Sequence, residues 1–414
     1  GDLDKAIVPV LPVSSYVKFF STNALDNLNL GPVITNETDV RLSSMKALTE
    51  NLQAGLEVEF LVCPKRKSEG ELTSKCQHEF DVRVLIEPAE DVACLRTFKN
   101  ENDDFHVKFV PKVPGTFNIT GKINGYKLVT SPFRVHAKER QIDVEGELVL
   151  KGGIPISPNW IALNSKGTIA ISDHKKHCIL TFDEDGNFVR KFGCYGKGPE
   201  QLAYPAGLTF LNDVELLVVD DGNNRIQQFN VQTGNLVKSF GKTGTGDGEF
   251  TGPEGIFIND EGHVIVTDYS NNRIQVLDKD GKFMYKFGDD DLGDLYGPTA
   301  CIYHKNKFIV SDSENHCLKV FDKSGKFLER EIGEKGEADG QFSSPEGLCV
   351  TKYGDHQNLL VCDRNNGRIQ QFTMEGRFIG KTIVKLRDPK AIATTPDGRI
   401  LVCDVKDKKI HILK

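Results

Sequence analysis

The sequence lacks several features that would each define a whole class of protein. It has no uninterrupted apolar run near the ~18 residues of a membrane-spanning helix, and its first residues lack a signal-peptide pattern. Its ten cysteines form no Cys-x-x-Cys pair and no zinc-like spacing. Its net charge of −7 lacks the positive excess of a general phosphate-coating protein. We therefore expect a cytoplasmic protein with free thiols, without a membrane or DNA as partner.

A ten-residue pattern, by contrast, recurs along the second two-thirds of the chain. Its clearest copies are Asp220-Asp-Gly-Asn-Asn-Arg-Ile-Gln-Gln-Phe229, 268–277 and 363–372. Weaker copies begin at Asp173, Asp312 and Asp404. A period of about 40–50 residues with several short strands per unit is typical of a β-propeller. Six copies predict a six-bladed propeller over residues 141–414.

The ends of this region suggest how the ring closes. The sixth unit stops at Ile410–Leu413 after only three strands, and an orphan strand at 147–151 precedes the first unit. Unpaired strand edges invite aggregation, so closed rings abolish them. We predict that strand 147–151 pairs with 410–413 and completes blade six.

Residues 1–140 read as short strands separated by turns, which predicts a β-sandwich. One stretch, 43–52, is predicted as a short helix. The end of this region runs from Phe105 through Pro111, Gly115-Thr-Phe117 and Asn124-Gly125 to Ser131-Pro-Phe133. These elements resemble the filamin-type immunoglobulin-like repeat.

The repeated units also resemble a known family. Blade three carries Gly244-Thr-Gly-Asp-Gly-Glu-Phe250, Pro253-Glu-Gly255 and Asp268 followed by Asn272-Arg-Ile-Gln275, and this is similar to the NHL repeat. A filamin-type domain followed by an NHL propeller resembles the C-terminal half of TRIM-NHL proteins. The resemblance implies a recognition module of an E3 ubiquitin ligase. The RING, B-boxes and coiled coil of that family are not found in this sequence, so any ligase activity would reside outside it and the chain itself would not be an enzyme.

Two kinds of site residue are expected in the propeller. The six repeated aspartates are predicted to be structural, since a short carboxylate at a turn bonds nearby amides and the following Arg can reach it. The face that carries the loops between second and third strands, here called the top face, is the predicted binding surface. A basic sector on blades five, six and one, with two tyrosines for stacking, supplies its candidate residues. These are Lys175, Lys176, His177, Tyr204, Tyr269, Arg364, Arg368, Lys390, Lys406 and Lys408.

Two functions stay open from the residues alone. In the first, the top face binds a protein substrate or partner. In the second, the basic sector binds RNA and the protein is a post-transcriptional regulator. Some TRIM-NHL propellers read RNA on this face, often with Arg just before each blade's proline, yet none of the six pre-proline residues here is basic and Asp388 is acidic. The first strands expected to line the central channel carry no His, Asp or Glu, so we predict no metal, no cofactor and no enzymatic site there.

Overall fold

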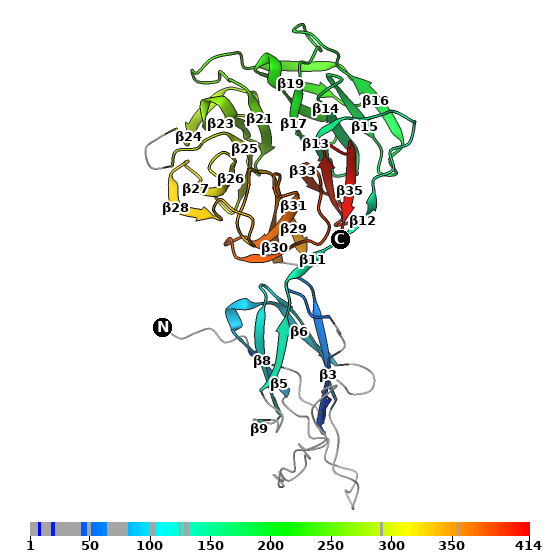
Figure 1. The fold of residues 1–414 in the computed structure, drawn as a ribbon, viewed down its shortest axis with the longest axis vertical. Coiled ribbons are helices and arrows are strands. Elements are labelled where there is room, and N and C mark those ends of the chain that lie inside the picture. Colours follow the sequence, from blue (N-terminus) through cyan, green and yellow to red (C-terminus); the bar gives the residue numbers. More distant parts are fainter. Residues whose placement is uncertain are drawn as a thin grey trace, which may run out of the picture. The chain divides into compact units, whose positions relative to one another are not determined.

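The computed structural model describes residues 7–9, 18–20, 43–47, 51–63, 82–99, 105–123, 126–127, 132–289, 293–353 and 356–414. The chain divides into two compact units. The first contains Gly1–Arg140 and Tyr353–His356, and the second contains Gln141–Lys352 and Gln357–Lys414. Both are built from strands (Figure 1). Within the described ranges, no helix is long and apolar enough to cross a membrane.

The first unit contains two five-stranded sheets. One has the order β1-β5-β8-β10 with β9 paired to β8, and the other has the order β2-β3-β4-β7-β6. The first sheet comprises β1 (Ile7–Pro9), β5 (Val82–Glu87), β8 (Gly115–Ile123), β9 (Tyr126–Lys127) and β10 (Phe133–Ala137). The second comprises β2 (Lys18–Phe20), β3 (Ser43–Ala47), β4 (Val58–Cys63), β6 (Val92–Lys99) and β7 (Phe105–Pro111), with the 3-10 turn η2 (Ala89–Asp91) between β5 and β6.

Both sheets contribute alternate side chains to one core. Phe60 of β4 and Phe109 of β7 meet edge to face, and Phe109 also contacts Phe117 of β8. This is the inward-facing alternation of a sandwich. The helix predicted at 43–52 is wrong: Ser43–Ala47 forms strand β3, which pairs with β4. Asn124, Gly125 and Ser131 lie outside the described residues.

The second unit contains six sheets, one for each repeat, arranged around a centre (Figure 1). Blade one is β13 (Pro158–Leu163), β14 (Ile169–Asp173), β15 (Cys178–Phe182) and β16 (Phe188–Phe192). Blade two is β17 (Pro205–Phe210), β18 (Glu215–Asp220), β19 (Arg225–Asn230) and β20 (Leu236–Phe240). Blade three is β21 (Pro253–Ile258), β22 (Val264–Asp268), β23 (Arg273–Leu277) and β24 (Phe283–Phe287).

Blades four to six continue the series. Blade four is β25 (Pro298–His304), β26 (Lys307–Asp312), β27 (Cys317–Asp322) and β28 (Phe327–Ile332). Blade five is β29 (Pro345–Tyr353), β30 (His356–Asp363), β31 (Arg368–Thr373) and β32 (Phe378–Thr382), with β11 (Arg140–Ile142) beside β32. Blade six is β33 (Pro389–Thr394), β34 (Ile400–Asp404) and β35 (Lys409–Leu413), with β12 (Val144–Glu147) beside β35. In each blade, a proline begins the first strand and the repeated aspartate ends the second.

Blade six is completed by a strand from the start of the propeller. Strand β12 pairs with β35 in the register Val144↔Leu413 and Glu147↔His411, and Leu148 N–H donates to the Ile410 carbonyl at 2.8 Å. The closing strand therefore lies at 144–147, three residues before the predicted 147–151. Blade five gains the unpredicted strand β11, where Ile383 N–H donates to the Ile142 carbonyl at 3.1 Å.

The glycine of the Pro-x-Gly motif allows neighbouring first strands to approach closely. A Cβ on Gly255 would lie 2.4 Å from the Thr299 carbonyl of blade four, and one on Gly207 would lie 2.6 Å from the Glu254 carbonyl of blade three. Because the obstructing atoms are backbone, the blades would have to move apart. The motif thus sets the spacing of the blades around the channel.

We expect Gly255→Ala to lower the free energy of unfolding by roughly 1–3 kcal/mol, the usual cost of overpacking. Gly146→Ala is the matched control, because a Cβ there meets nothing within 4 Å. Urea unfolding of both variants checks this. Equal stability of the two would show that the blades have room to adjust.

Candidate binding site at the mouth of the propeller

The repeated aspartates are buried and hold the loops of each blade together. Asp268 has no exposed surface. It accepts hydrogen bonds from Arg273 Nε at 2.8 Å, Gln275 Nε2 at 3.1 Å, Asn271 Nδ2 at 2.9 Å and Thr251 N–H at 2.8 Å. Arg273 then donates to the carbonyls of the preceding connection. The Asp-x-x-Asn-x-Arg-x-Gln spacing is therefore one hydrogen-bonded unit that fastens the blade connection to the blade.

The weaker repeats fill the same positions with other residues. In blade four, Lys319 Nζ lies 3.0 Å from Asp312. In blade one, Asp173 accepts hydrogen bonds from the N–H groups of Ser157 and Lys176 at 3.0 and 2.9 Å.

In blade five, a clear copy of the repeat, Arg368 donates to Asp363 at 2.7 Å and to two carbonyls of the connection that precedes the blade. Arg368 is thus a structural residue, which corrects its assignment to the binding surface.

Blade six has one group of side chains whose spacing could suit a metal ion: Asp404, Asp407 and His411. His411 lies seven residues after the aspartate, where blades two, three and five have Gln, and its Nε2 is 3.7 Å from Asp404 Oδ2. Asp404 also accepts the N–H groups of Arg387 and Asp407 at 2.8 and 3.1 Å. We interpret the group as this blade's version of the repeat network.

Two rings of variable residues surround the top opening of the channel, and we call them together the mouth. The inner ring holds the residue after each blade's proline: Asn159, Ala206, Glu254, Thr299, Glu346 and Lys390. The outer ring holds the residue after each repeated aspartate: His174, Asp221, Tyr269, Ser313, Arg364 and Val405. The flanking Pro and Asp are the same in all six blades, whereas these twelve positions differ. The fold thus places chemically distinct side chains at equivalent points.

Ion pairs cross the mouth. Lys390 Nζ of blade six lies 2.8 Å from Glu254 Oε1 of blade three, the blade opposite it in a ring of six. Arg364 bonds Asp388 Oδ1 at 2.6 Å and also bonds Glu346. The predicted basic sector is corrected here: Arg364 and Lys390 are neutralised by carboxylates and do not offer free positive charge.

Burial and charge set the protonation of these groups. Burial raises the pKa of Glu346, which is only 4% exposed, although Lys390 and Arg364 act against the rise. Burial alone would lower the pKa of Lys390, but Glu254 and Glu346 outweigh it and raise that pKa. Burial and the nearby Lys390 lower the pKa of His174. At neutral pH the lysine is therefore charged and the histidine is neutral.

Asp221 is the one acidic residue of the outer ring, and it forms no ion pair among the described residues. It begins the 3-10 turn η3 (Asp221–Asn223) and is partly exposed. Burial, followed by the neighbouring Glu254, raises the pKa of Asp221 to about 7. In an unfolded chain this carboxyl would titrate near its usual value of about 3.9.

The difference between the pKa of Asp221 in the folded and the unfolded chain predicts that Asp221→Asn stabilises the fold in a pH-dependent way. Between pH ~4 and ~7 the folded protein holds a proton that the unfolded chain has lost, so the charge of Asp221 destabilises the fold increasingly as pH rises. We expect the variant to be more stable than the wild type at pH 8 by about 1–2 kcal/mol, allowing for its partial exposure, and equal to it near pH 4. Thermal melts from pH 4 to 8 check this. A constant difference across that range would contradict it.

The rim outside the mouth keeps exposed basic and aromatic groups. Lys175, Lys176, Lys406 and Lys408 are exposed on adjacent loops of blades one and six, although the Lys176 ammonium also donates to the Pro155 carbonyl. The ring of His177 contacts the rings of Tyr195 and Tyr204 at 4.7 and 4.6 Å, and Tyr204 is 45% exposed. Tyr269 is held differently, because its hydroxyl donates to Glu314 at 3.0 Å.

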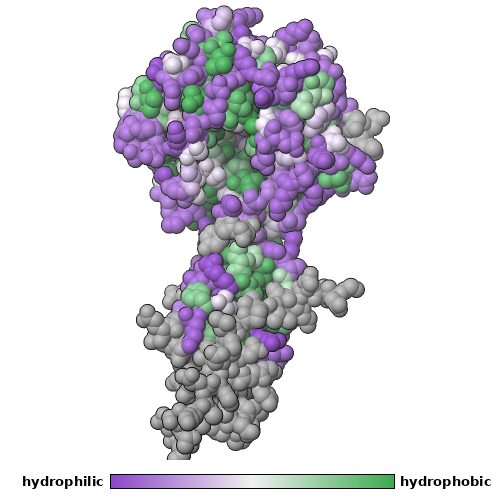
Figure 2. All heavy atoms as spheres, turned by 180° about the vertical axis from the view of Figure 1, so that it is seen from behind, coloured by the Kyte–Doolittle hydropathy of each residue, from purple (hydrophilic) through white to green (hydrophobic). Residues whose placement is uncertain are grey.

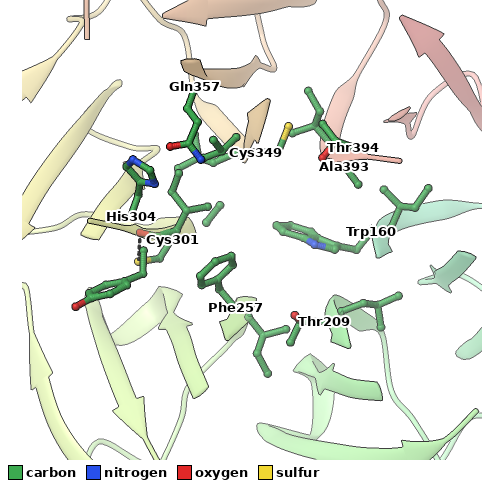
Figure 3. Close-up of a pocket in the computed structure, with 18 of the residues that line it drawn as sticks. Trp160, Thr209, Phe257, Cys301, His304, Cys349, Gln357, Ala393 and Thr394 are labelled. Atoms are coloured by element: carbon green, nitrogen blue, oxygen red, sulfur yellow. Dashed lines mark hydrogen bonds between the residues drawn. The ribbon is translucent and has the colours of Figure 1, made fainter. Parts of the chain in front are cut away.

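Below the mouth, the first strands enclose a cavity of about 580 Å³ (Figure 3). Trp160, Phe257, Cys301 and Cys349 are among the residues that line it. Figure 2 shows apolar side chains in this central hollow within a largely hydrophilic surface. Polar residues on the face opposite the mouth add to its lining: His304, the last residue of first strand β25, and Asp260 and Lys305 of the loops between first and second strands. The expectation that the first strands carry no His, Asp or Glu is therefore wrong at His304, because β25 extends one residue further than predicted, and a loop adds Asp260.

Two known family models match parts of the propeller. A family model described as NHL repeat matches residues 250–277, and one described as 6-bladed beta-propeller matches residues 295–409. With six sheets in a ring, these matches confirm the prediction of an all-β chain with a six-bladed NHL propeller. A filamin-type identity of the first unit is not among these matches.

The similar curated proteins match only a short part of this chain. RING finger protein nhl-1 of Caenorhabditis elegans is 42% identical over 72 residues, which are 17% of this chain and 7% of that protein. Protein brain tumor of Drosophila melanogaster is 37% identical over 81 residues, 18% of this chain and 8% of that protein. The matched segments thus cover less than a tenth of these relatives. The chain is thus similar to these two proteins over a short segment only.

Solved structures agree on the fold alone. An auxiliary nutrient binding protein from Bacteroides ovatus superimposes with a TM-score of 0.50 at 12% identity, covering 89% of this chain and 96% of that one. A streptogramin B lyase reaches 0.48 at 17% identity over 65% of this chain and 96% of that one. At 12% identity, the likeness to the nutrient binding protein supports a shared fold alone.

Proposed function

We propose that this chain is the non-catalytic recognition module of a TRIM-NHL-like E3 ubiquitin ligase, and that it binds a protein substrate or partner through the top face of the propeller. The observation that carries this proposal is the mouth. Its carboxyl groups are Asp221, Glu254 and Glu346, with Asp388 beside it. The two cations, Arg364 and Lys390, pair with Glu254, Glu346 and Asp388 and leave Asp221 without an ion pair among the described residues. A surface with excess acid at its centre repels phosphates and suits a protein partner.

A second candidate function rests on the rim. The rim has exposed lysines on blades one and six and the exposed ring of Tyr204. Positive charge and aromatic rings are the groups with which proteins bind single-stranded nucleic acids. An RNA held there would avoid the acidic mouth and touch only one side of the top face. This arrangement is the alternative function, that of an RNA-binding post-transcriptional regulator.

Fluorescence anisotropy with labelled RNA hairpins and single strands separates the two. The wild-type chain is compared with a Lys175/Lys176/Lys406/Lys408→Glu variant at low and moderate salt. Our proposal expects wild-type binding no tighter than the ~10⁻⁴–10⁻⁶ M of non-specific contacts. Tight, salt-sensitive binding that the folded variant loses would establish the RNA function in its place.

Two further assignments belong to this proposal. The two-sheet first unit is proposed to be the filamin-type domain that precedes the propeller, on the resemblance of its Pro111, Gly115 and Phe133 elements. The cytoplasm is proposed as the location, on the unpaired cysteines among the described residues.

A further inference from the structure

We propose that the mouth binds one cationic side chain, an arginine or lysine of an extended partner segment, with Asp221 and Glu254 as its receptor carboxyl groups. This inference rests on the proposed protein-binding function and names the chemistry that the same face would recognise. It follows from the charge at the mouth, from unpartnered buried atoms beside it, and from the accessibility of Asp221.

The charge balance of the mouth calls for one more cation. Arg364 is shared between Glu346 and Asp388, and Lys390 is held by Glu254. Glu254 adds to the effect of burial in raising the pKa of Asp221, so the two carboxyl groups repel each other. The neutral His174 supplies no compensating charge. Burying an unpaired carboxylate is costly, so an incoming cation gains by neutralising this pair.

Unpartnered polar atoms mark the same ring as incomplete. Glu346 Oε2 and Asn159 Nδ2 have no hydrogen-bond partner within the described part of the chain, and each of these residues is only 4% exposed. Buried polar atoms are nearly always hydrogen-bonded, so exceptions point to a missing group. Glu346 offers an acceptor, which suits an N–H of a cation. Asn159 offers a donor, which suits the carbonyl oxygen of a peptide backbone.

The receptor carboxyl group of Asp221 is within reach of solvent. It lies on the outer ring and is partly exposed, and Glu254 of the inner ring has 17% of its side chain exposed. A long, flexible side chain with a charged end can reach both from the top face, as lysine and arginine stems do elsewhere. A guanidinium suits the site best, because its planar donors can bond two carboxylates at once.

The single tryptophan gives a direct test. Trp160 follows Asn159 in the chain and lines the cavity directly below the mouth. Its fluorescence is followed while Nα-acetyl-arginine amide is added at constant ionic strength. We expect a saturable change with a dissociation constant of about 1 mM, as fits one charged side chain. The citrulline analogue, which has the same shape without the charge, is expected to bind at least ~10-fold more weakly.

Variants and a second probe locate the site. Asp221→Asn is expected to weaken the arginine derivative ~10-fold while remaining folded, as its predicted stability at pH 8 allows. Asp280→Asn is the matched control, because Asp280 is exposed on an outer hairpin of blade three, and it should bind as the wild type does. n-Butylguanidine has the same guanidinium and the same net charge without a peptide carbonyl, so we expect it to bind several-fold more weakly.

Equal binding of citrulline and arginine derivatives, or unchanged binding by Asp221→Asn, would overturn the inference. Binding of n-butylguanidine as tight as that of the arginine derivative would overturn the assignment to a peptide segment. The proposed protein-binding function fails separately. If proteins crosslink to the top face but the arginine derivative does not bind, the protein-binding function stands and the cation site is refuted. If the arginine derivative binds but no protein partner is found, the cation site stands and the protein-binding function is refuted.

Discussion

Removing residues 406–414 is expected to abolish the cooperative unfolding of the propeller. Strand β35 lies between β34 and β12, so its loss leaves both neighbours with unpaired edges. It also removes Ile410 and Leu413, which are 2% and 1% exposed. In a ring each blade is supported on both sides, so an opened blade six exposes the flanks of blades one and five as well. We expect the truncated chain to show no sharp thermal transition, by circular dichroism or calorimetry.

A control variant and a peptide test whether this result depends on strand β35. The full chain with Lys406→Ala and Lys408→Ala keeps β35 and changes only exposed side chains, so it should melt like the wild type. A synthetic peptide of residues 406–414 added to the truncated chain should restore part of the transition, because it can pair between β34 and β12. A truncated chain that melts sharply at the wild-type temperature would show that the ring does not depend on this closure.

Asp268→Ala is expected to cost about 3–5 kcal/mol of unfolding free energy, the usual result of removing one partner of a buried ion pair. The change leaves Arg273, only 3% exposed, as a buried charge without its carboxylate. It also removes the acceptor for Gln275, Asn271 and the Thr251 N–H. Urea unfolding measures the loss. Asp280→Ala, on an exposed carboxyl group, should stay within about 0.5 kcal/mol of the wild type.

A double variant tests the cause. If the cost comes from stranding the guanidinium, then Asp268→Ala combined with Arg273→Met should destabilise much less than the sum of the two single changes. Strict additivity would mean that the two side chains act independently. The same loss from Asp268→Ala as from Asp280→Ala would mean that the repeat network is not what holds the blade connection.

The local repeat made most of the propeller predictable. A proline that starts the first strand and an aspartate that ends the second are short-range signals, so six copies were enough to place six blades. The closing strand was misplaced because 144–151 has no motif of its own, and its register depends on pairing with β35. Strand β3 was taken for a helix because the sheet that fixes Ser43–Ala47 is formed by residues distant in sequence.

The mouth was predictable only in part. Its positions follow the proline and the aspartate of each blade, and three of them, Tyr269, Arg364 and Lys390, are among the predicted binding residues. Their pairing could not be found this way. Lys390 meets Glu254 because opposite blades face each other across the channel, and Arg364 meets Asp388 through the next blade. Arg364 and Lys390, which were predicted as part of a basic sector, are neutralised because the ring brings carboxylates next to them.

The most direct measurement of the central proposal is photo-crosslinking from the top face. The crosslinking residue p-benzoyl-phenylalanine replaces Tyr204, which is 45% exposed beside the mouth, or Met284, which is 43% exposed on the outer strand β24. Both proteins are irradiated in RNase-treated cell extract. We predict defined protein adducts from position 204 that position 284 does not give. The same adducts from both positions would contradict a protein-recognition role for this face. So would adducts that form in untreated extract and are absent after RNase treatment.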